Sequence, residues 1–358
     1  MSKRSMNLDI LKIIAMFFVV VLHVLGYSNM TTGAAYSRGV DMCYHFLDAL
    51  SYPAIHIFAL CGFSLMSRKM IATNQGQLLP CLKVWVPTWI ICIIGLIIAI
   101  PLGIPFDMTD LIKTVFPFLG QGYWFVSAYI SMILLTPFLN LLIQRLDKKG
   151  LLRLVLILFV LVSVLPTLPG RFNWNSNYSS LTLFVLLYFM AALLNTLDLK
   201  RYRFIGLVLF VGCAVANFLL WFGLKYILSV ETAASNEYFY TYYNPLVILQ
   251  GMGLYIFVNG LDGVSYRDNW VSKIVRKAAD ATLVTYLIHM YPIIKNSYVP
   301  AGLLTFMNSH NGLIYALQAL TLCVLVCVVG TLAAIPVNKM TKYLLCGIQN
   351  RNKMVEGK

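Results

Sequence analysis

Charged side chains are scarce in this sequence. Only 11% of the 358 residues are Asp, Glu, Lys or Arg, whereas 60% are hydrophobic and the mean hydropathy is +0.79. Soluble globular domains carry about 25% charged residues, so the composition excludes an ordinary soluble fold. No polar stretch is long enough to form a separate soluble domain. We therefore expect residues 1–358 to form a single domain integrated in a membrane.

Several sequence motifs for soluble chemistry are also missing. The chain has no G-x-S-x-G elbow, no Walker loop and no G-x-G-x-x-G, so hydrolase, NTPase and dinucleotide-binding functions lack support. It also lacks the paired, interrupted apolar segments of many secondary transporters. Among eight cysteines, the only close pair is Cys323 and Cys327, one helical turn apart, which suits neither a zinc site nor a disulfide framework. We expect these cysteines to pack in the interior.

Apolar segments of membrane-spanning length are what the sequence has in abundance. They predict an all-α, polytopic membrane helical bundle of about ten transmembrane helices with both termini cytoplasmic. The basic N-terminus lacks a small-residue cleavage site, so we expect the first segment to be retained. Residues 339–358 are expected to form a short cytoplasmic C-terminal tail. The predicted spans lie near residues 8–28, 44–66, 84–103, 123–143, 151–168, 181–197, 204–224, 242–260, 280–299 and 312–337.

The net charge of +14 follows from where the basic residues lie. The connections expected on the inner side, such as RLDKKG (145–150) and LDLKRYR (197–203), hold most of the 27 lysines and arginines. This asymmetry is what the positive-inside rule predicts, so the charge indicates topology and membrane lipids rather than nucleic acid as a partner. The inner segment 261–280 is expected to form an amphipathic helix, either on the anionic inner leaflet or against a cofactor phosphate.

Two expected outer loops combine aromatic rings with Asn, Ser and Thr. They are PGRFNWNSNYSS (169–180) and VETAASNEYFYTYYNP (230–245). The mixture suits stacking on a sugar, but Tyr and Trp also gather at any membrane interface. The loops alone therefore do not identify a sugar enzyme.

The first predicted span carries three polar residues, Asp9, Lys12 and His23. The eleven residues from Lys12 to His23 turn a helix by about 1100°, or about 20° beyond three full turns, and rise about 16 Å. The three side chains therefore share one stripe. Asp9 and Lys12 fit either a functional role or an interface pair with Lys12 reaching toward the headgroups. His23 fits either proton transfer or a structural, hydrogen-bonded histidine.

Other histidines lie in later segments. His289 follows Tyr286 by one turn in the ninth predicted span, and His56 lies near the middle of the second. They come from separate spans without short ligand spacing or a carboxylate at matching depth, so we expect no metal site. His45 and His310 fall at or beyond the outer boundary and call for no special role.

Five segments, in order, resemble the motifs of the acyltransferase-3 family. They are LDILKIIAMFFVVVLH, AIHIFALCGFSLMSRK, LKVWVPTW, YWFVSAYISMILLTPFLN and DATLVTYLIHMYP, which together span nearly the whole chain. The members of this family are multi-span bacterial enzymes that acylate, usually acetylate, sugars of surface polysaccharides, peptidoglycan, lipids or glycosides. The resemblance implies a multi-pass protein of the bacterial inner membrane that transfers acetyl from cytosolic acetyl-CoA to a carbohydrate hydroxyl.

The resemblance also implies roles for residues. His23 matches the family's essential histidine. Lys12, which lies three residues after Asp9, stands at the position where the family most often has arginine, and we expect Asp9 to act together with Lys12. Lys offers a point charge instead of the bidentate fork of Arg. Only Lys83 matches the basic residues that usually precede the third-span proline. The cationic groups expected to hold the phosphates of acetyl-CoA are Lys12, Arg68, Lys69 and Lys83, and the residues matching substrate or supporting positions are Trp124, Tyr286 and His289.

Alternatives remain open at this point. His23 would act either as the base that deprotonates the acceptor or as a transient acyl carrier. A non-enzymatic exporter of a glycan or lipid, and a scaffold for polysaccharide assembly, are rival functions. Acyl donors other than acetyl-CoA, the acceptor sugar and the oligomeric state are not specified by the sequence, although no arginine inside a span points to a succinyl donor.

Overall fold

The computed structural model describes most of the chain as helices. Within the described residues there is no β-strand, which confirms the expected all-α class. A backbone surrounded by hydrocarbon must satisfy its own hydrogen bonds, and helices do so within each segment. The described residues are 4–32, 37–69, 77–104, 107–116, 123–168, 180–229, 240–262, 264–267, 269–291, 306–307 and 309–356.

Seven helical stretches of the described chain are long and apolar enough to cross a membrane. This confirms a multi-pass membrane protein, and the finer count of ten stays a prediction. Two shorter apolar helices occupy predicted spans as well, at Ser180–Leu194 and Pro245–Asn259. The seven stretches are Met6–Ser28, Arg38–Met66, Leu78–Ala99, Trp124–Arg145, Lys148–Thr167, Arg203–Ile227 and Gly312–Gly347.

The first half of the chain follows the predicted spans, with the second divided into two helices, and adds one further helix. The added helix, α5, begins after Asp107, whose carboxylate accepts a hydrogen bond of 2.8 Å from the backbone N–H of Asp110, and Asp110 reciprocates. This capping box satisfies N–H groups that the first turn leaves unpaired. The helices are α1 (Met6–Thr32), α2 (Arg38–Ser51), α3 (Ala54–Met66), α4 (Leu78–Ala99), α5 (Met108–Val115) and α6 (Trp124–Arg145).

The second half contains two π-helical turns. One, η1, continues α7, and the other, η2, continues α10. Turns of this kind are rare and often occur at functional sites. The elements are α7 (Lys148–Phe159), η1 (Val160–Val164), α8 (Leu165–Thr167), α9 (Ser180–Leu194), α10 (Arg203–Phe222), η2 (Gly223–Ile227), α12 (Pro245–Asn259), α13 (Trp270–His289) and α16 (Gly312–Glu356).

Helix α13 begins ten residues before the ninth predicted span. The side chain of Asn269 caps it by accepting a 2.9 Å hydrogen bond from the backbone N–H of Ser272. Residues 270–280 of the expected amphipathic segment, 261–280, therefore form the first part of α13. Residues 292–299 of the predicted span lie outside the described residues, as do 169–179 and 230–239 of the two aromatic loops.

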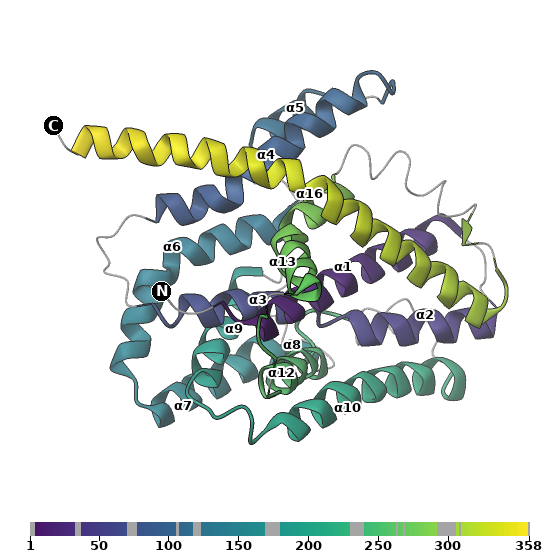
Figure 1. Ribbon diagram of the computed structural model, residues 1–358. Helices are drawn as coiled ribbons and strands as arrows, with labels where there is room; N and C mark the ends of the chain where they lie inside the picture. Colours follow the sequence, from purple (N-terminus) through teal and green to yellow (C-terminus); the bar gives the residue numbers. More distant parts are fainter. Residues whose placement is uncertain are drawn as a thin grey trace.

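Helix α16 is 45 residues long and continues through residues 339–356 of the predicted C-terminal tail, 339–358. At 1.5 Å per residue it extends about 68 Å, more than twice the thickness of a hydrocarbon core. Figure 1 shows its C-terminal end reaching past the neighbouring helix α4.

Helix ends that carry many lysines and arginines meet at one end of the bundle, which we call the basic end. There Arg68 after α3 donates to Asn195 after α9, and Arg4 before α1 pairs with Asp280 of α13 at 2.9 Å. Lys200 before α10 pairs with Asp262 after α12. The opposite end, where α2 begins and η2 ends, we call the far end. The assignment of the basic end to the cytoplasm stays a prediction.

Helix α1 lies at the centre of the bundle. It packs against α2, α3, α12, α13 and α16, and Figure 1 shows it crossing the middle of the molecule. The side chains of Leu11, Ala15, Val20 and Leu25 have no exposed surface. Because protein surrounds this helix, its polar stripe faces other side chains.

Candidate active site

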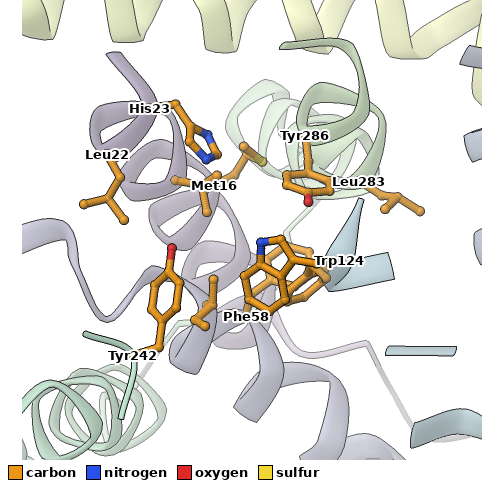
Figure 2. A pocket seen from close by; sticks show the side chains of 11 residues that line it. Met16, Leu22, His23, Phe58, Trp124, Tyr242, Leu283 and Tyr286 are labelled. Atoms are coloured by element: carbon orange, nitrogen blue, oxygen red, sulfur yellow. The ribbon is translucent and has the colours of Figure 1, made fainter. Parts of the chain in front are cut away.

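A pocket opens beside α1 where α3, α6, α13 and the turn before α12 come together. The space within it that the centres of water-sized molecules can occupy is about 40 Å³. Most of its wall is apolar, and four polar side chains interrupt it, as Figure 2 shows. The lining residues are Met16, Val19, Leu22, His23, Ile55, Phe58, Trp124, Phe125, Tyr242, Leu283 and Tyr286.

The predicted stripe of α1 leads into this pocket. Met16, Val19 and His23 follow one another at the three- and four-residue intervals that keep side chains on one helical face, and all three line the pocket. Lys12 is one turn before Met16 on the same stripe, toward the basic end. His23 thus stands in the pocket, and Lys12 stands outside its lining.

The ring of His23 is hydrogen-bonded to that of His289. Nδ1 of His23 lies 2.9 Å from Nε2 of His289, and Nδ1 of His289 lies 2.7 Å from the carbonyl oxygen of Thr285. A carbonyl only accepts, so Nδ1 of His289 carries the hydrogen and Nε2 of the neutral ring is an acceptor. His23 must then donate from Nδ1, which leaves the lone pair of the neutral His23 ring on Nε2. A basic and nucleophilic nitrogen is therefore held in a half-buried position at the pocket.

Tyr286 and Trp124 approach the pocket from α13 and α6. In Figure 2 the hydroxyl of Tyr286 points toward Trp124. That hydroxyl is buried and has no hydrogen-bond partner among the described residues. Tyr123, beside Trp124, donates a 2.8 Å hydrogen bond to the carbonyl of Leu287 and so joins the two helices. The predicted residues His23, Trp124, Tyr286 and His289 are thus neighbours in space.

Tyr242 is a pocket residue that sequence reasoning did not single out. Nε2 of His56 donates a 2.8 Å hydrogen bond to its carbonyl oxygen and anchors the turn before α12. The indole of Trp124 lies 5.7 Å from its ring. The composition of the aromatic loop was the one available signal, because Tyr242 lies at its end.

Asp9 and Lys12 belong to a cluster at the basic end. The Asp9 carboxylate, 2% exposed, is paired with Arg4, lies 3.4 Å from Nζ of Lys12, and accepts a 2.5 Å hydrogen bond from the hydroxyl of Tyr266. Burial, together with the bond to Asp9, raises the pKa of Tyr266 to about 12, so this hydroxyl stays protonated and donates. The guanidinium of Arg276 lies 4.7 Å from the Tyr266 ring. Arg4, Tyr266 and Arg276 were not predicted.

The other predicted phosphate-binding residues are dispersed. Both Nε and an Nη of Arg68 donate to Asn195 Oδ1, at 2.9 and 2.5 Å, so its fork is used within the protein. Lys69 and Lys83 are exposed. No contact in the described chain joins these three side chains to each other or to the pocket.

Comparison with protein-family models gives a match over most of the chain. The model of the acyltransferase-3 family, described as an acyltransferase domain, matches residues 7–335. The matched region contains every pocket residue and the cluster around Asp9 except Arg4. No curated protein and no solved structure was found to match the chain.

Proposed function

Since this chain belongs to the acyltransferase-3 family, we propose that it moves an acetyl group from cytosolic acetyl-CoA to a hydroxyl of an envelope carbohydrate. The family and the apolar helices make it a multi-pass membrane acyltransferase. The acetyl donor, the carbohydrate acceptor and a location in a bacterial inner membrane are parts of the proposal. The observation that carries it is the lone pair of His23 Nε2 at the pocket, oriented by His289.

The proposed reaction uses His23 as a general base. Nε2 of His23 takes the proton of the acceptor hydroxyl as its oxygen attacks the thioester carbonyl carbon. The C–S bond then breaks, and the departing thiolate takes the proton from Nε2, which gives an ester and free CoA. The imidazolium that forms in between is stabilised through its Nδ1–H bond to His289, as a neighbouring acceptor stabilises the histidine of a hydrolase triad.

The donor is proposed to enter from the basic end. Lys12, Arg4 and Arg276 lie there, around Asp9 and Tyr266, and supply more positive than negative charge for phosphate groups. From Lys12 the stripe of α1 leads about 16 Å along the helix axis to His23. This cluster suits a phosphate-bearing donor better than the dispersed Arg68, Lys69 and Lys83.

Replacement of His23 tests the proposal. Removing a general base lowers turnover by about 10²- to 10⁴-fold, so His23→Gln should reduce acetyl-CoA consumption by the purified protein to that extent. Acetyl groups on surface glycans should fall in cells matched for protein level. Unchanged acetylation would overturn the role of His23.

A rival function and a rival role of His23 make different predictions. A glycan or lipid exporter would consume no acyl-CoA in the presence of sugar acceptors. An acyl carrier would leave an acylated His23 that can be trapped by rapid acid quenching of a reaction without acceptor, whereas a general base leaves none.

A further inference from the structure

Helix α2 carries a polar stripe that the reaction described above does not use. Asp41, His45, Asp48 and Tyr52 follow one another at four-, three- and four-residue intervals, so they lie within about 60° of one another around the helix. They interrupt the membrane-spanning stretch Arg38–Met66. We refer to these four residues as the α2 stripe. It runs from the far end of the bundle toward the turn that holds Tyr242.

The stripe faces the aromatic turn before α12 and the end of α10. The ring of His45 stacks on Trp221 with centroids 3.8 Å apart, and lies 5.4 Å from the ring of Tyr240. The hydroxyl of Tyr240 donates to the carbonyl of His45 at 3.3 Å. Figure 1 shows α2 lying alongside α10. These polar groups therefore face protein.

The far end of the stripe is compensated in charge. The Asp41 carboxylate accepts hydrogen bonds of 2.6 Å from Nζ of Lys225 and 2.6 Å from the hydroxyl of Tyr226. Nε2 of His45 lies 3.5 Å from the other carboxylate oxygen. This end is held together by its own contacts.

Asp48 is different. It lies between His45 and Tyr52, whose rings are 5.4 and 5.8 Å from that of Tyr240, so its carboxyl faces the same aromatic turn. Among the described residues it has neither an ion pair nor a side-chain hydrogen bond. A carboxylate at membrane depth costs about 2.5–3.5 kcal/mol or more, and such residues generally mark a ligand path.

The Asp48 end of the stripe adjoins the active-site pocket. The ring of Tyr52 lies 5.2 Å from that of Tyr242, which lines the pocket. The hydroxyl of a tyrosine is protonated near neutral pH, so Tyr242 can donate a hydrogen bond. Figure 2 shows this hydroxyl directed toward the side of the pocket that holds His23 and Met16. The stripe thus adjoins the pocket through the rings of Tyr52 and Tyr242.

Buried polar atoms without a partner in the described chain occur at both ends of this arrangement. They are the hydroxyl of Tyr286 in the pocket and Nδ1 of His45 on the stripe. Buried polar atoms are normally hydrogen-bonded, so an unpaired one calls for a missing partner. A ligand that carries several hydroxyl groups would supply such partners.

We propose that Asp48, with the rings of Tyr52, Tyr240 and Tyr242, forms the acceptor subsite beside the pocket and selects sugars bearing hydroxyl or amino groups there. This inference rests on the proposed function. A carboxylate accepts hydrogen bonds from adjacent hydroxyls or pairs with an ammonium, and aromatic rings pack on the apolar faces of sugars. A sugar carrying a carboxylate or phosphate next to the acylated hydroxyl would place its negative charge against the carboxyl oxygens of Asp48 and bind less tightly.

The experiment compares three oligosaccharides of equal length, made of neutral glucose, amine-bearing glucosamine and acidic galacturonate units. Their dissociation constants are measured by calorimetry on the whole protein in lipid nanodiscs, alongside acetyl transfer from acetyl-CoA. We expect the neutral and amine-bearing probes to bind at least tenfold more tightly than the acidic one. Asp48→Asn should reduce this preference below threefold. Asp107→Asn, which removes a far-end charge and keeps a capping oxygen, should retain it.

Several outcomes would overturn the subsite. They are equal binding of the acidic probe to the wild type, no sugar binding by the wild type, or an undiminished preference in Asp48→Asn. Thermal unfolding verifies that Asp48→Asn is folded, and Asp48→Ser provides a second neutral variant if it is not. Preserved sugar selectivity without acetyl transfer would reject the proposed function and retain the subsite, so the two failures are distinguishable.

Discussion

A single hydrogen bond within α13 determines which ring nitrogen of His23 carries the lone pair that can accept a proton. The bond exists because Thr285 and His289 are four residues apart on α13, where the Thr285 carbonyl can accept from Nδ1 of His289. This local contact fixes the acceptor that His23 meets from another helix. His289 is therefore a positioning residue, and its effect should appear in turnover.

Replacing His289 separates positioning from simple packing. His289→Leu removes the acceptor for Nδ1 of His23, so kcat for acetyl transfer should fall by about 10²- to 10⁴-fold, as when a histidine loses its orienting partner. His289→Gln keeps an amide oxygen that can accept, and should retain more activity. The KM for acetyl-CoA should change little in both. A wild-type kcat in His289→Leu would contradict the assignment of the His23 hydrogen to Nδ1.

Lys12 offers a second test at this scale. Lys12→Arg keeps the positive charge beside Asp9 and should retain activity, whereas Lys12→Ala should raise the KM for acetyl-CoA at least fivefold. The exposed Lys339 of α16 provides a control, since Lys339→Ala should leave KM unchanged. Equal kinetics in the Arg and Ala variants of Lys12 would mean that it only reaches toward the headgroups.

Helical periodicity and the resemblance together select residues that the structure places close to one another, while their roles stay predictions. Periodicity places Lys12 and His23 on one stripe, and the resemblance selects Trp124, Tyr286 and His289, which lie around the pocket. Neither signal brings Tyr242 or Arg4 to the site, because those positions depend on how separate segments pack. For the same reason the hydrogen bonds of Arg68 to Asn195, 127 residues apart, were not anticipated.

At the scale of elements, the crossing of α10 and α12 depends on two glycines. A Cβ at Gly206 would lie 2.7 Å from the carbonyl oxygen of Gly253 and 2.8 Å from the backbone N of Phe257. A Cβ at Gly253 would lie 2.7 Å from the backbone N of Phe210. Small residues allow such close backbone approach between membrane helices.

Gly206→Ala should therefore destabilise the bundle. The methyl group would press against backbone, which cannot move aside as a side chain does, and overpacking costs about 1–3 kcal/mol. Gly212 is on the same helix, and a methyl group added there would have nothing within 4 Å, so Gly212→Ala should be neutral or stabilising. Thermal unfolding in detergent would show this contrast. A Gly206→Ala midpoint equal to that of Gly212→Ala would argue against the close crossing.

The helices themselves were largely predictable. Most predicted spans coincide with helices because long apolar runs have no other way to satisfy their backbone in lipid. The exceptions have local causes. Helix α5 depends on the capping box of Asp107 and Asp110, and α13 starts early because Asn269 caps it within a polar stretch. Hydropathy detects neither kind of signal.

At the scale of the whole molecule, the distribution of charge sets its expected orientation. The basic end is expected to face the cytoplasm. Cys346 in the long extension of α16 is exposed, and Asp107 at the start of α5 is exposed toward the far end. These two positions can report opposite sides of the membrane.

A membrane-impermeant maleimide provides the measurement. In intact cells we expect it to leave Cys346 unlabelled until the membrane is permeabilised. A cysteine introduced by Asp107→Cys, in a chain with Cys346→Ser, should react without permeabilisation. Labelling of Cys346 in intact cells would place the basic end outside the cytoplasm, and would contradict the proposed entry of the donor from that end.

The apolar wall of the pocket has a consequence for the membrane as a barrier. Met16, Val19, Leu22, Ile55 and Phe58 surround the place where donor and acceptor are proposed to meet from opposite sides. Narrow hydrophobic passages shed water and so block ions. A dry junction also denies water the chance to compete with the sugar and hydrolyse the thioester. The same side chains that shape the site would thus spare the cell both an ion leak and a futile loss of its acyl donor.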